Sequence, residues 1–318
     1  MNLLAQRHQF EATKRIHESA KLVFHGVEGF DVYNTSIPFA WQGKSYLFGR
    51  VERRGEWARS WVRLFENSGR DEWSLVKDSM IYQLEDPYVS ILGDTLVLGG
   101  THVRYKQGTI DTYYGYFYRG ADLGDLHYFT TGPDCMKDIR LVGMADGRIG
   151  VFSRPRSEEV RRRYGSESVI GFTVIDNLEG LTADVIENAP IIHGLFAKDE
   201  WGGCNQCYLL ESGRIGVAGH ICYKATEPNG VAMQSYMNMS FVLDPATHEA
   251  SDLAIIGTRP CYPAGPAKRL DLEDCAFTSG LVMRADGKVD LYSGIGDCEE
   301  GRIVIAYPFQ GHGKIVSP

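Results

Sequence analysis

The 318-residue chain has no excess of positive charge and few cysteines. Lys and Arg total 33 against 41 Asp and Glu, and the formal net charge is −8. Proteins that bind the nucleic-acid backbone need a basic surface, so this class is disfavoured, although a small basic pocket can exist within an acidic surface. The seven cysteines are an odd number, which predicts reduced thiols. Cys204 and Cys207 have CxxC spacing but no second ligand pair, so we expect no zinc site.

Long apolar runs are also missing. The first 20 residues are polar and charged from Gln6 onward and contain no apolar core of signal-peptide length. No window of the sequence is long and apolar enough to span a membrane. Together with the reduced thiols, these absences lead us to expect a cytoplasmic protein with neither a nucleic-acid nor a membrane partner.

Helical periodicity is scarce. Only residues 9–20 and 157–164 are predicted as short helices. Most other segments are short runs rich in Val, Ile, Tyr and Phe, which Gly, Asp and Asn turns separate. With 36 glycines, 17 tyrosines and an ordinary hydrophobic fraction of 43%, the composition predicts an all-β fold with a real core.

Five segments repeat one pattern, in which a turn glycine precedes an apolar strand. The glycines are Gly43, Gly93, Gly147, Gly213 and Gly287, and seven residues after them stand Arg50, Gly100, Arg154, His220 and Gly294. A polar marker residue precedes each turn: Asn34, Asp86, Asp138, Asn205 and Asp274. The first two intervals between markers, about 50 residues each, are close to the length of a propeller blade.

The later intervals are longer and need loop insertions, for which residues 223–229 and 259–268 are the predicted loops. We therefore predict one five-bladed β-propeller domain over residues 1–318, with a short N-terminal helical segment. The alternative is a pair of β-sandwiches in which the repeated pattern is coincidental.

Equivalent positions of propeller blades form a ring around a central channel, so the markers should share one end of it. With them we place Arg50, Glu52, His102, Arg154, Arg156 and His220. Arginine suits phosphate or carboxylate, so a basic cluster beside an acid favours an enzyme that handles a phosphate or sugar phosphate. Taken singly, each arginine is more often a surface ion pair, and His220 is more often a buried, hydrogen-bonded side chain.

Asp86 stands out among the markers because Pro87 follows it. Proline disfavours helix at the preceding residue, so we expect an extended Asp86 at the mouth of a strand. The alternative is a solvated acid in a turn. Five aromatic residues flank the ring and could stack on sugar faces, although each alone is more often packing: Tyr88, Trp201, Tyr208, Tyr223 and Phe277.

Several short motifs fall in the order of a known group. They are Asn34-Thr35-Ser36, Glu85-Asp86-Pro87, Lys137-Asp138, Ser153-Arg154-Pro155, Gly219-His220, the segment from Asp274 to Gly280, and the segment from Tyr292 to Asp297. Together they resemble the mannoside phosphorylases of glycoside hydrolase family 130, which are five-bladed propellers. The residues within these motifs more closely resemble the sister group, the β-1,2-mannosyltransferase/phosphorylases of glycosyltransferase family 108, which are known from trypanosomatid parasites. The chain departs from the pattern at Ser153, where His is usual, and at Trp201-Gly202-Gly203-Cys204-Asn205.

The resemblance implies an inverting β-1,2-mannoside phosphorylase or mannosyltransferase. Asp86 would be the proton donor, and phosphate would be the nucleophile. The implied phosphate-binding residues are Arg50, Arg154, Arg156 and His220. The implied sugar-binding residues are Asn34, Thr35, Glu85, Tyr88, Asp138, Asn205, Tyr208, Tyr223, Asp274 and Phe277. No cofactor or metal is expected; the partners would be a mannose oligosaccharide and phosphate, a sugar phosphate or a sugar nucleotide.

Two rival functions fit the same residues. In a propeller glycosidase, water attacks and a second acid, Asp138 or Asp274, is the base. A non-catalytic carbohydrate-binding propeller would not need a proton donor, so Asp86→Asn would change nothing. For the phosphorylase, Arg154→Ala is expected to raise the phosphate requirement and leave the fold intact.

Overall fold

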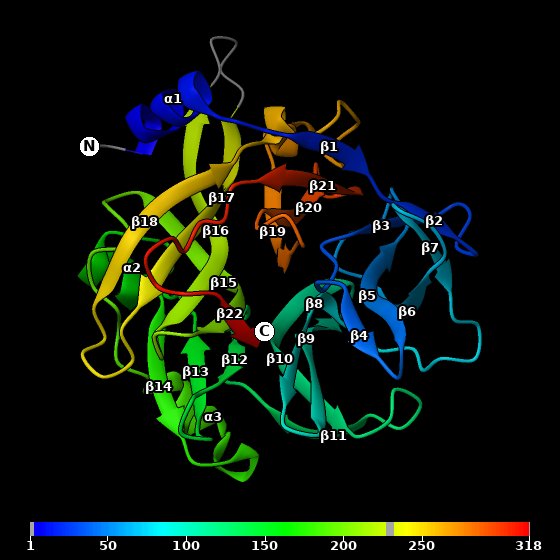
Figure 1. The fold of residues 1–318 in the computed structure, drawn as a ribbon, viewed down its shortest axis with the longest axis horizontal. Coiled ribbons are helices and arrows are strands. Elements are labelled where there is room, and N and C mark those ends of the chain that lie inside the picture. Colours follow the sequence, from blue (N-terminus) through cyan, green and yellow to red (C-terminus); the bar gives the residue numbers. More distant parts are fainter. Residues whose placement is uncertain (1–2, 227–231, 318) are drawn as a thin grey trace. The chain divides into compact units, whose positions relative to one another are not determined.

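The computed structural model describes residues 3–226 and 232–317, and strands dominate it (Figure 1). Its five sheets are the blades of a five-bladed β-propeller, so the predicted fold class is confirmed. All five turn glycines have left-handed backbones, with φ between 61° and 85°, which glycine adopts without a steric cost. Each precedes a strand of a different sheet: β5 (Lys44–Glu52), β9 (Thr95–Lys106), β13 (Ile149–Ser153), β16 (Ile215–Thr226) and β20 (Val289–Ile295).

The remaining strands complete the five sheets. The first sheet adds β2 (Val23–His25), β3 (Asp31–Tyr33), β4 (Phe39–Trp41), β6 (Trp61–Asn67) and β7 (Glu72–Leu75). The second adds β8 (Glu85–Leu92), β10 (Thr109–Gly120) and β11 (His127–Thr131), and the third adds β12 (Arg140–Gly143) and β14 (Gly171–Ile175). The fourth adds β15 (Glu200–Leu210), β17 (Ala232–Leu243), β18 (Ala250–Gly257) and β22 (Ile315–Ser317). The fifth adds β1 (Glu18–Lys21), β19 (Ala276–Met283) and β21 (Glu299–Ile305).

The chain forms two compact units. Unit 1 comprises Met1–Pro87, Gly219–Met239 and Ala254–Pro308, and unit 2 comprises Tyr88–Ala218, Ser240–Leu253 and Phe309–Pro318. Each has its own apolar core, with Leu47 and Phe65 fully buried in unit 1 and Val97 and Leu141 fully buried in unit 2. The site residues can therefore be assigned to one unit or the other.

Close packing in unit 1 fixes one glycine of β5. A Cβ on Gly49 would lie 2.8 Å from a methyl of Val32 and 3.0 Å from the ring of Phe65. Any larger residue would push β3 and β6 away from β5, at the typical cost of an overpacked core, about 1–3 kcal/mol. The strand that carries Arg50 is thus held firmly between its neighbours.

The helices differ in part from the prediction. Helix α1 spans Leu3–Thr13 rather than residues 9–20, because residues 18–21 instead form β1, whose Glu18 pairs with Val304 of β21. Tertiary pairing overrides local helix preference there. Helix α2 (Glu158–Tyr164) is as predicted, with Ser157 as N-cap and Gly165 as C-cap. Helix α3 (Ala183–Glu187) was not predicted.

The two predicted loops have different outcomes. Residues 223–226 belong to β16, so that part of the first prediction is wrong, and residues 227–229 lie outside the described residues. Residues 259–268 contain one short 3-10 helix, η2 (Arg259–Cys261), and no strand, so the second loop is confirmed. Within the described residues, no helix has the length and apolar character needed to cross a membrane.

Candidate active site

Asp86 lies near the start of β8 in unit 1 and is 4% exposed. Its φ is 48°, so the expectation of an extended backbone is wrong. Aspartate tolerates the left-handed region better than most residues, and two hydrogen bonds hold its side chain there. The Asn34 amide donates to Asp86 Oδ1 at 2.8 Å, and Arg50 Nη1 donates to the same oxygen at 2.9 Å. Strained residues held in this way are frequent at catalytic sites.

Arg50, near the C-terminal end of β5, organises the acids of unit 1. Its Nη2 donates to Glu85 at 2.9 Å and to Glu52 at 3.4 Å, and its Nε donates to Ser60 at 2.7 Å. Together with the bond to Asp86, these contacts direct a buried guanidinium at three carboxylates. Its predicted contact with phosphate stays a prediction, since the observed bonds all go to protein oxygens.

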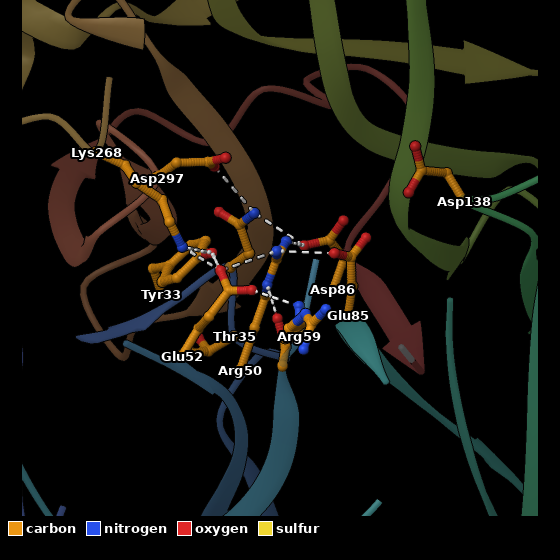
Figure 2. Close-up of polar contacts among 12 residues, drawn as sticks. Tyr33, Thr35, Arg50, Glu52, Arg59, Glu85, Asp86, Asp138, Lys268 and Asp297 are labelled. Carbon is orange, nitrogen blue, oxygen red and sulfur yellow. Dashed lines mark hydrogen bonds and ion pairs between the residues drawn. The ribbon is translucent and has the colours of Figure 1, made fainter. Parts of the chain in front are cut away.

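Lys268 is a buried cation of the same cluster that the sequence analysis did not select (Figure 2). Its Nζ forms an ion pair with Glu52 and donates to the Tyr33 hydroxyl at 3.1 Å, while that hydroxyl donates to Glu52 at 2.5 Å. Burial opposes ionisation of Glu52, but Arg50 and Lys268 outweigh it and lower the pKa of its carboxyl. Burial also raises the pKa of Tyr33 well above its usual value, which keeps the phenol protonated as a donor.

Asp297 is a further acid beside Asn34 that was not selected from the sequence. The Asn34 amide donates to Asp297 Oδ1 at 3.3 Å, so one side chain contacts both Asp86 and Asp297. Both Asn34 and Asp297 have left-handed backbones, with φ of 46° and 56°. The segment from Tyr292 to Asp297 was among the motifs of the resemblance, so a signal for this residue was present.

Glu300 of β21 contacts the residue after Asn34 and is 1% exposed. Neutral donors surround its carboxyl: the Ser279 hydroxyl at 2.7 Å and the Thr35 backbone amide at 3.2 Å. Burial raises the pKa of Glu300 to about 8 and outweighs these hydrogen bonds, which lower it. Thr35 itself is buried and donates its hydroxyl to the Ser36 carbonyl. Its predicted sugar contact stays a prediction.

Asp274 also lies in unit 1, and an arginine of the N-terminal helix binds it. Arg7 of α1 holds both oxygens of Asp274, with Nη2 at 2.9 Å from Oδ1, and donates to the Tyr223 hydroxyl at 3.0 Å. Ser235 donates to the same carboxylate at 2.5 Å. The sequence analysis placed Asp274 and Tyr223 at a sugar but missed Arg7, since nothing in the blade repeat points to α1.

His220 of β16 is fully buried in an aromatic environment of unit 1. Its ring centroid lies 4.7 Å from that of Phe277 and 5.9 Å from that of Tyr236. Phe277 is 8% exposed and packs with Leu272. Burial is what we expected of His220 taken singly, whereas the contact with phosphate that its place in the repeat favours stays a prediction.

A second charged cluster lies in unit 2 around Asp138, whose φ is 58°. Arg154 Nη1 donates to Asp138 Oδ2 at 2.7 Å, and Arg140 Nη2 lies 3.6 Å from Oδ1. Burial opposes the charge on Asp138, but Arg154 and Arg140 outweigh it and lower its pKa. Arg140 Nε also donates to the carbonyl of Asn205 at 2.6 Å. Asp138, Asn205 and Arg154 therefore come together as predicted, and Arg140 is the member that was missed.

Two of the predicted sugar-stacking aromatics are core residues of unit 2. Tyr88 is 2% exposed, Arg140 covers its ring at 4.6 Å, and a Cβ on Gly99 would lie 2.1 Å from it. Tyr208 is 1% exposed and packs against Phe309. Stacking needs an accessible ring face, so this prediction is wrong for both residues. Their neighbours across strands, which no periodicity reveals, decide the outcome.

The remaining predicted residues of unit 2 lie in other settings. Trp201 is 4% exposed, so the prediction that it stacks on a sugar is wrong for the same reason as for Tyr88 and Tyr208. His102 stacks on Tyr116 with centroids 4.6 Å apart and interplanar angle 7°, within a row of aromatic rings on β9 and β10. Arg156 is half-buried and lines a cavity of about 430 Å³ with Arg161 and Tyr113. The charge of Arg156 helps to lower the pKa of Asp138.

The unit 1 cluster has the chemistry of a proton-transfer site. Four carboxylates, those of Glu52, Glu85, Asp86 and Asp297, surround two buried cations, Arg50 and Lys268. A buried acid fixed by an arginine and an amide can serve as a general acid.

Comparison with solved structures first defines the class. A glycosyl hydrolase from Bacteroides ovatus superposes with a TM-score of 0.60 at 12% identity, covering 96% of this chain and 95% of that one. At this identity the likeness shows the fold alone. The protein is thus a five-bladed propeller of an architecture also found in a glycoside hydrolase.

Residues 8–311 match the family described as "Protein of unknown function (DUF1861)", and the chain belongs to this family. A mannose phosphorylase from Leishmania mexicana, MPT-4, solved with a phosphate ion, is 50% identical, with a TM-score of 0.93 and coverage of 99% and 96% of the two chains. MPT-1, a GDP-Man-dependent mannosyltransferase from the same organism, is 48% identical, with a TM-score of 0.93 and coverage of 100% and 99%. A search of curated proteins gave no match.

The predicted kinship with mannose phosphorylases and mannosyltransferases is therefore confirmed. The two numbered families named for it stay a prediction. So do the individual roles of the site residues, except where the contacts above contradict them.

Proposed function

We propose that this protein is an inverting mannoside phosphorylase and mannosyltransferase that moves mannose between a β-1,2-mannan chain and phosphate. Two relatives with these activities, at 48–50% identity over nearly the whole chain, support the class of reaction. The observation that carries the proposal in this chain is Asp86, a buried acid with a left-handed backbone that Asn34 and Arg50 hold in place. The β-1,2 linkage rests on the sequence resemblance.

Asp86 is the proton donor in the proposed mechanism. A phosphate oxygen forms a bond to the anomeric carbon of the terminal mannose while the bond from that carbon to the glycosidic oxygen breaks. Asp86 gives its proton to the departing oxygen, and mannose 1-phosphate and a shortened chain leave. In the reverse direction Asp86 accepts the proton from the incoming hydroxyl, as microscopic reversibility requires.

The bonds to Asp86 suit both protonation states. When Asp86 is ionised, Arg50 and Asn34 donate to Oδ1 and stabilise the charge. When it is protonated, Oδ2 can carry the proton and Oδ1 still accepts both bonds. The same side-chain position therefore serves both directions of the reaction.

We infer that phosphate is held by arginine and histidine side chains rather than by the acidic cluster of unit 1. Negative charge on Glu52, Glu85 and Asp297 would repel a phosphate placed against them. Arg154, Arg156 and His220 stay the predicted phosphate ligands. Arg50, the fourth predicted ligand, is left out of this proposal because its guanidinium already donates to three carboxylates. Arginine and histidine can also stabilise the charge of a nucleotide diphosphate leaving group, so transfer from a mannose sugar nucleotide is the second proposed activity, which the relationship to MPT-1 favours.

An assay of phosphate-dependent turnover tests the proposal. The protein is incubated with β-1,2-mannobiose and inorganic phosphate, and mannose 1-phosphate is followed by phosphorus NMR. We expect mannose 1-phosphate from the wild type and its loss in Asp86→Asn, with the exposed Asp78→Asn as a matched control. Free mannose formed without phosphate would indicate a hydrolase. Binding without turnover, unchanged in Asp86→Asn, would indicate a carbohydrate-binding protein.

The same preparation incubated with GDP-mannose and mannobiose tests the transferase activity, with GDP and a lengthened chain as the expected products. A cytoplasmic location is also part of the proposal. It rests on the seven cysteines, all of which are free thiols.

A further inference from the structure

Trp57 is a large apolar side chain in an exposed position on the segment that joins β5 to β6. Its side chain is 44% exposed, whereas most large apolar residues of unit 1 strands are buried. The next residue, Ala58, has a left-handed backbone with φ of 54° and is 8% exposed. A non-glycine residue rarely adopts this conformation, so the turn that presents Trp57 is held by its surroundings.

The acid cluster itself holds this segment. The backbone amide of Arg59 donates to Glu52 Oε1 at 2.7 Å, and the Ser60 hydroxyl accepts from Arg50 Nε at 2.7 Å. Figure 2 shows Arg59 and Lys268 beside the Glu52 side chain. Two chain segments, residues 53–60 and residues 262–270, are therefore attached to one carboxylate, and Arg50 links that carboxylate to Asp86.

The two segments meet again at Trp57. The guanidinium of Arg269 lies 4.9 Å from the centroid of the Trp57 ring, a cation–π contact. Asp271 binds Arg269 through both oxygens, at 2.9 and 3.0 Å. This bidentate pair fixes the guanidinium and neutralises its charge. The rim at Trp57 thus combines an exposed aromatic ring with a compensated charge.

We propose that Trp57, supported by Arg269, is a stacking platform for a neutral sugar unit of the mannoside chain, next to the unit that is transferred. The inference rests on the proposed function. Charge decides between ligands here: Asp271 neutralises Arg269, and the acids around Glu52 disfavour an anion, so an uncharged sugar fits this rim better than a nucleotide diphosphate. The sugar face would lie on the indole, and sugar hydroxyls could accept hydrogen bonds from the outer N–H groups of Arg269.

The platform predicts an effect on the mannoside substrate. For β-1,2-mannobiose and longer chains, Trp57→Ala should raise KM roughly ten-fold, the value of one aromatic stacking contact, with kcat changed little. Trp57→Phe should restore most of the affinity. Trp61→Ala is the matched control, because Trp61 is 39% exposed in the same unit and packs edge-on against Phe30. It should behave as the wild type.

A binding experiment makes the result independent of turnover. The intrinsic fluorescence of Asp86→Asn is titrated with mannotriose without phosphate, and the change should vanish in the Asp86→Asn, Trp57→Phe double variant, which keeps a ring but removes the reporter indole. Asp86→Asn with Trp57→Ala should bind roughly ten-fold more weakly by calorimetry. Equal affinities with and without Trp57 would overturn the platform even if phosphorolysis is observed. If Trp57→Ala weakens the binding of GDP more than it weakens the binding of mannotriose, the ring belongs to a nucleotide site instead.

The two ideas can fail separately. If the wild type releases no mannose 1-phosphate but binds mannotriose through Trp57, the proposed reaction is wrong and the platform holds. If phosphorolysis proceeds and every Trp57 variant keeps the wild-type KM for all chain lengths, the platform is wrong and the reaction holds.

Discussion

Replacing Glu300 by glutamine should make the stability of the protein less sensitive to pH. Glu300 is 1% exposed, and burial raises its pKa from 4.5 to about 8. The folded protein therefore keeps a proton that the unfolded chain releases above pH 4.5. Below pH 4.5 Glu300 is protonated in both states, so its ionisation does not change the free energy of unfolding. Between pH 4.5 and 8 it ionises only in the unfolded state, so the free energy of unfolding falls with every unit of pH.

The size of the effect follows from this window. Each pH unit is worth about 1.4 kcal/mol, so the buried acid lowers the free energy of unfolding by about 3 kcal/mol at pH 7 relative to pH 4.5. Glutamine cannot ionise, so the variant lacks this pH-dependent loss of stability. It also has one acceptor oxygen for two donors, Ser279 and the Thr35 amide, which costs about 1 kcal/mol at every pH. The variant should thus be slightly less stable than the wild type at pH 5 and more stable at pH 7.

Urea unfolding at pH 5, 6, 7 and 8 measures this difference. We expect the stability of Glu300→Gln relative to wild type to rise by about 3 kcal/mol from pH 5 to pH 7 and to level off above pH 8. Glu299→Gln is the control, because Glu299 is partly exposed and forms an ion pair with Lys21 at 2.8 Å. A difference between Glu300→Gln and wild type that stays constant from pH 5 to pH 8 would refute the reasoning.

Three further predictions concern the charged residues of the two units. Asp86→Asn should lower kcat for phosphorolysis by about 10²–10⁴-fold, the value of general acid catalysis, with an unchanged melting temperature; an active variant would remove Asp86 from the reaction. Arg154→Ala should raise the phosphate requirement. Contrary to the sequence-based expectation, it should also destabilise the fold by about 3–5 kcal/mol, because Asp138 stays buried with only the more distant Arg140 beside it. Arg154→Lys, measured in the same urea titration, should recover part of the lost stability. Arg7→Ala should leave Asp274 without its guanidinium and expose α1 to limited proteolysis, and a helix as protected as in the wild type would show that other contacts hold it.

The blade repeat could be predicted from the sequence because it is a backbone requirement. Each turn needs a residue with positive φ, and glycine supplies it at Gly43, Gly93 and the three later turns. The same equivalence brought Asn34 and Asp86 together, 52 residues apart in the chain and 2.8 Å apart in the structure. Features repeated once per blade are thus readable without any knowledge of packing.

Two of the missed residues come from segments that do not repeat. Lys268 lies in a loop, Arg7 lies in the N-terminal helix, and neither has an equivalent in other blades. The wrong predictions for Tyr88 and Tyr208 have another cause. The sequence pattern around each of them would be the same whether the ring were exposed or buried. Only the neighbouring strand decides, as Gly99 does by leaving room for Tyr88.

The pairing of β1 with β21 sets an order of events during synthesis. Glu18 and Ser19 of β1 pair with Val304 and Ile303 of β21. The first strand of unit 1 therefore cannot pair until β21, near the end of the chain, has left the ribosome. Residues 88–218, most of unit 2, are contiguous and emerge long before that. Until translation reaches β21, the backbone amides and carbonyls of β1 stay open to other strands. The nascent chain therefore needs protection from aggregation at its N-terminal strand until the closing pair can form.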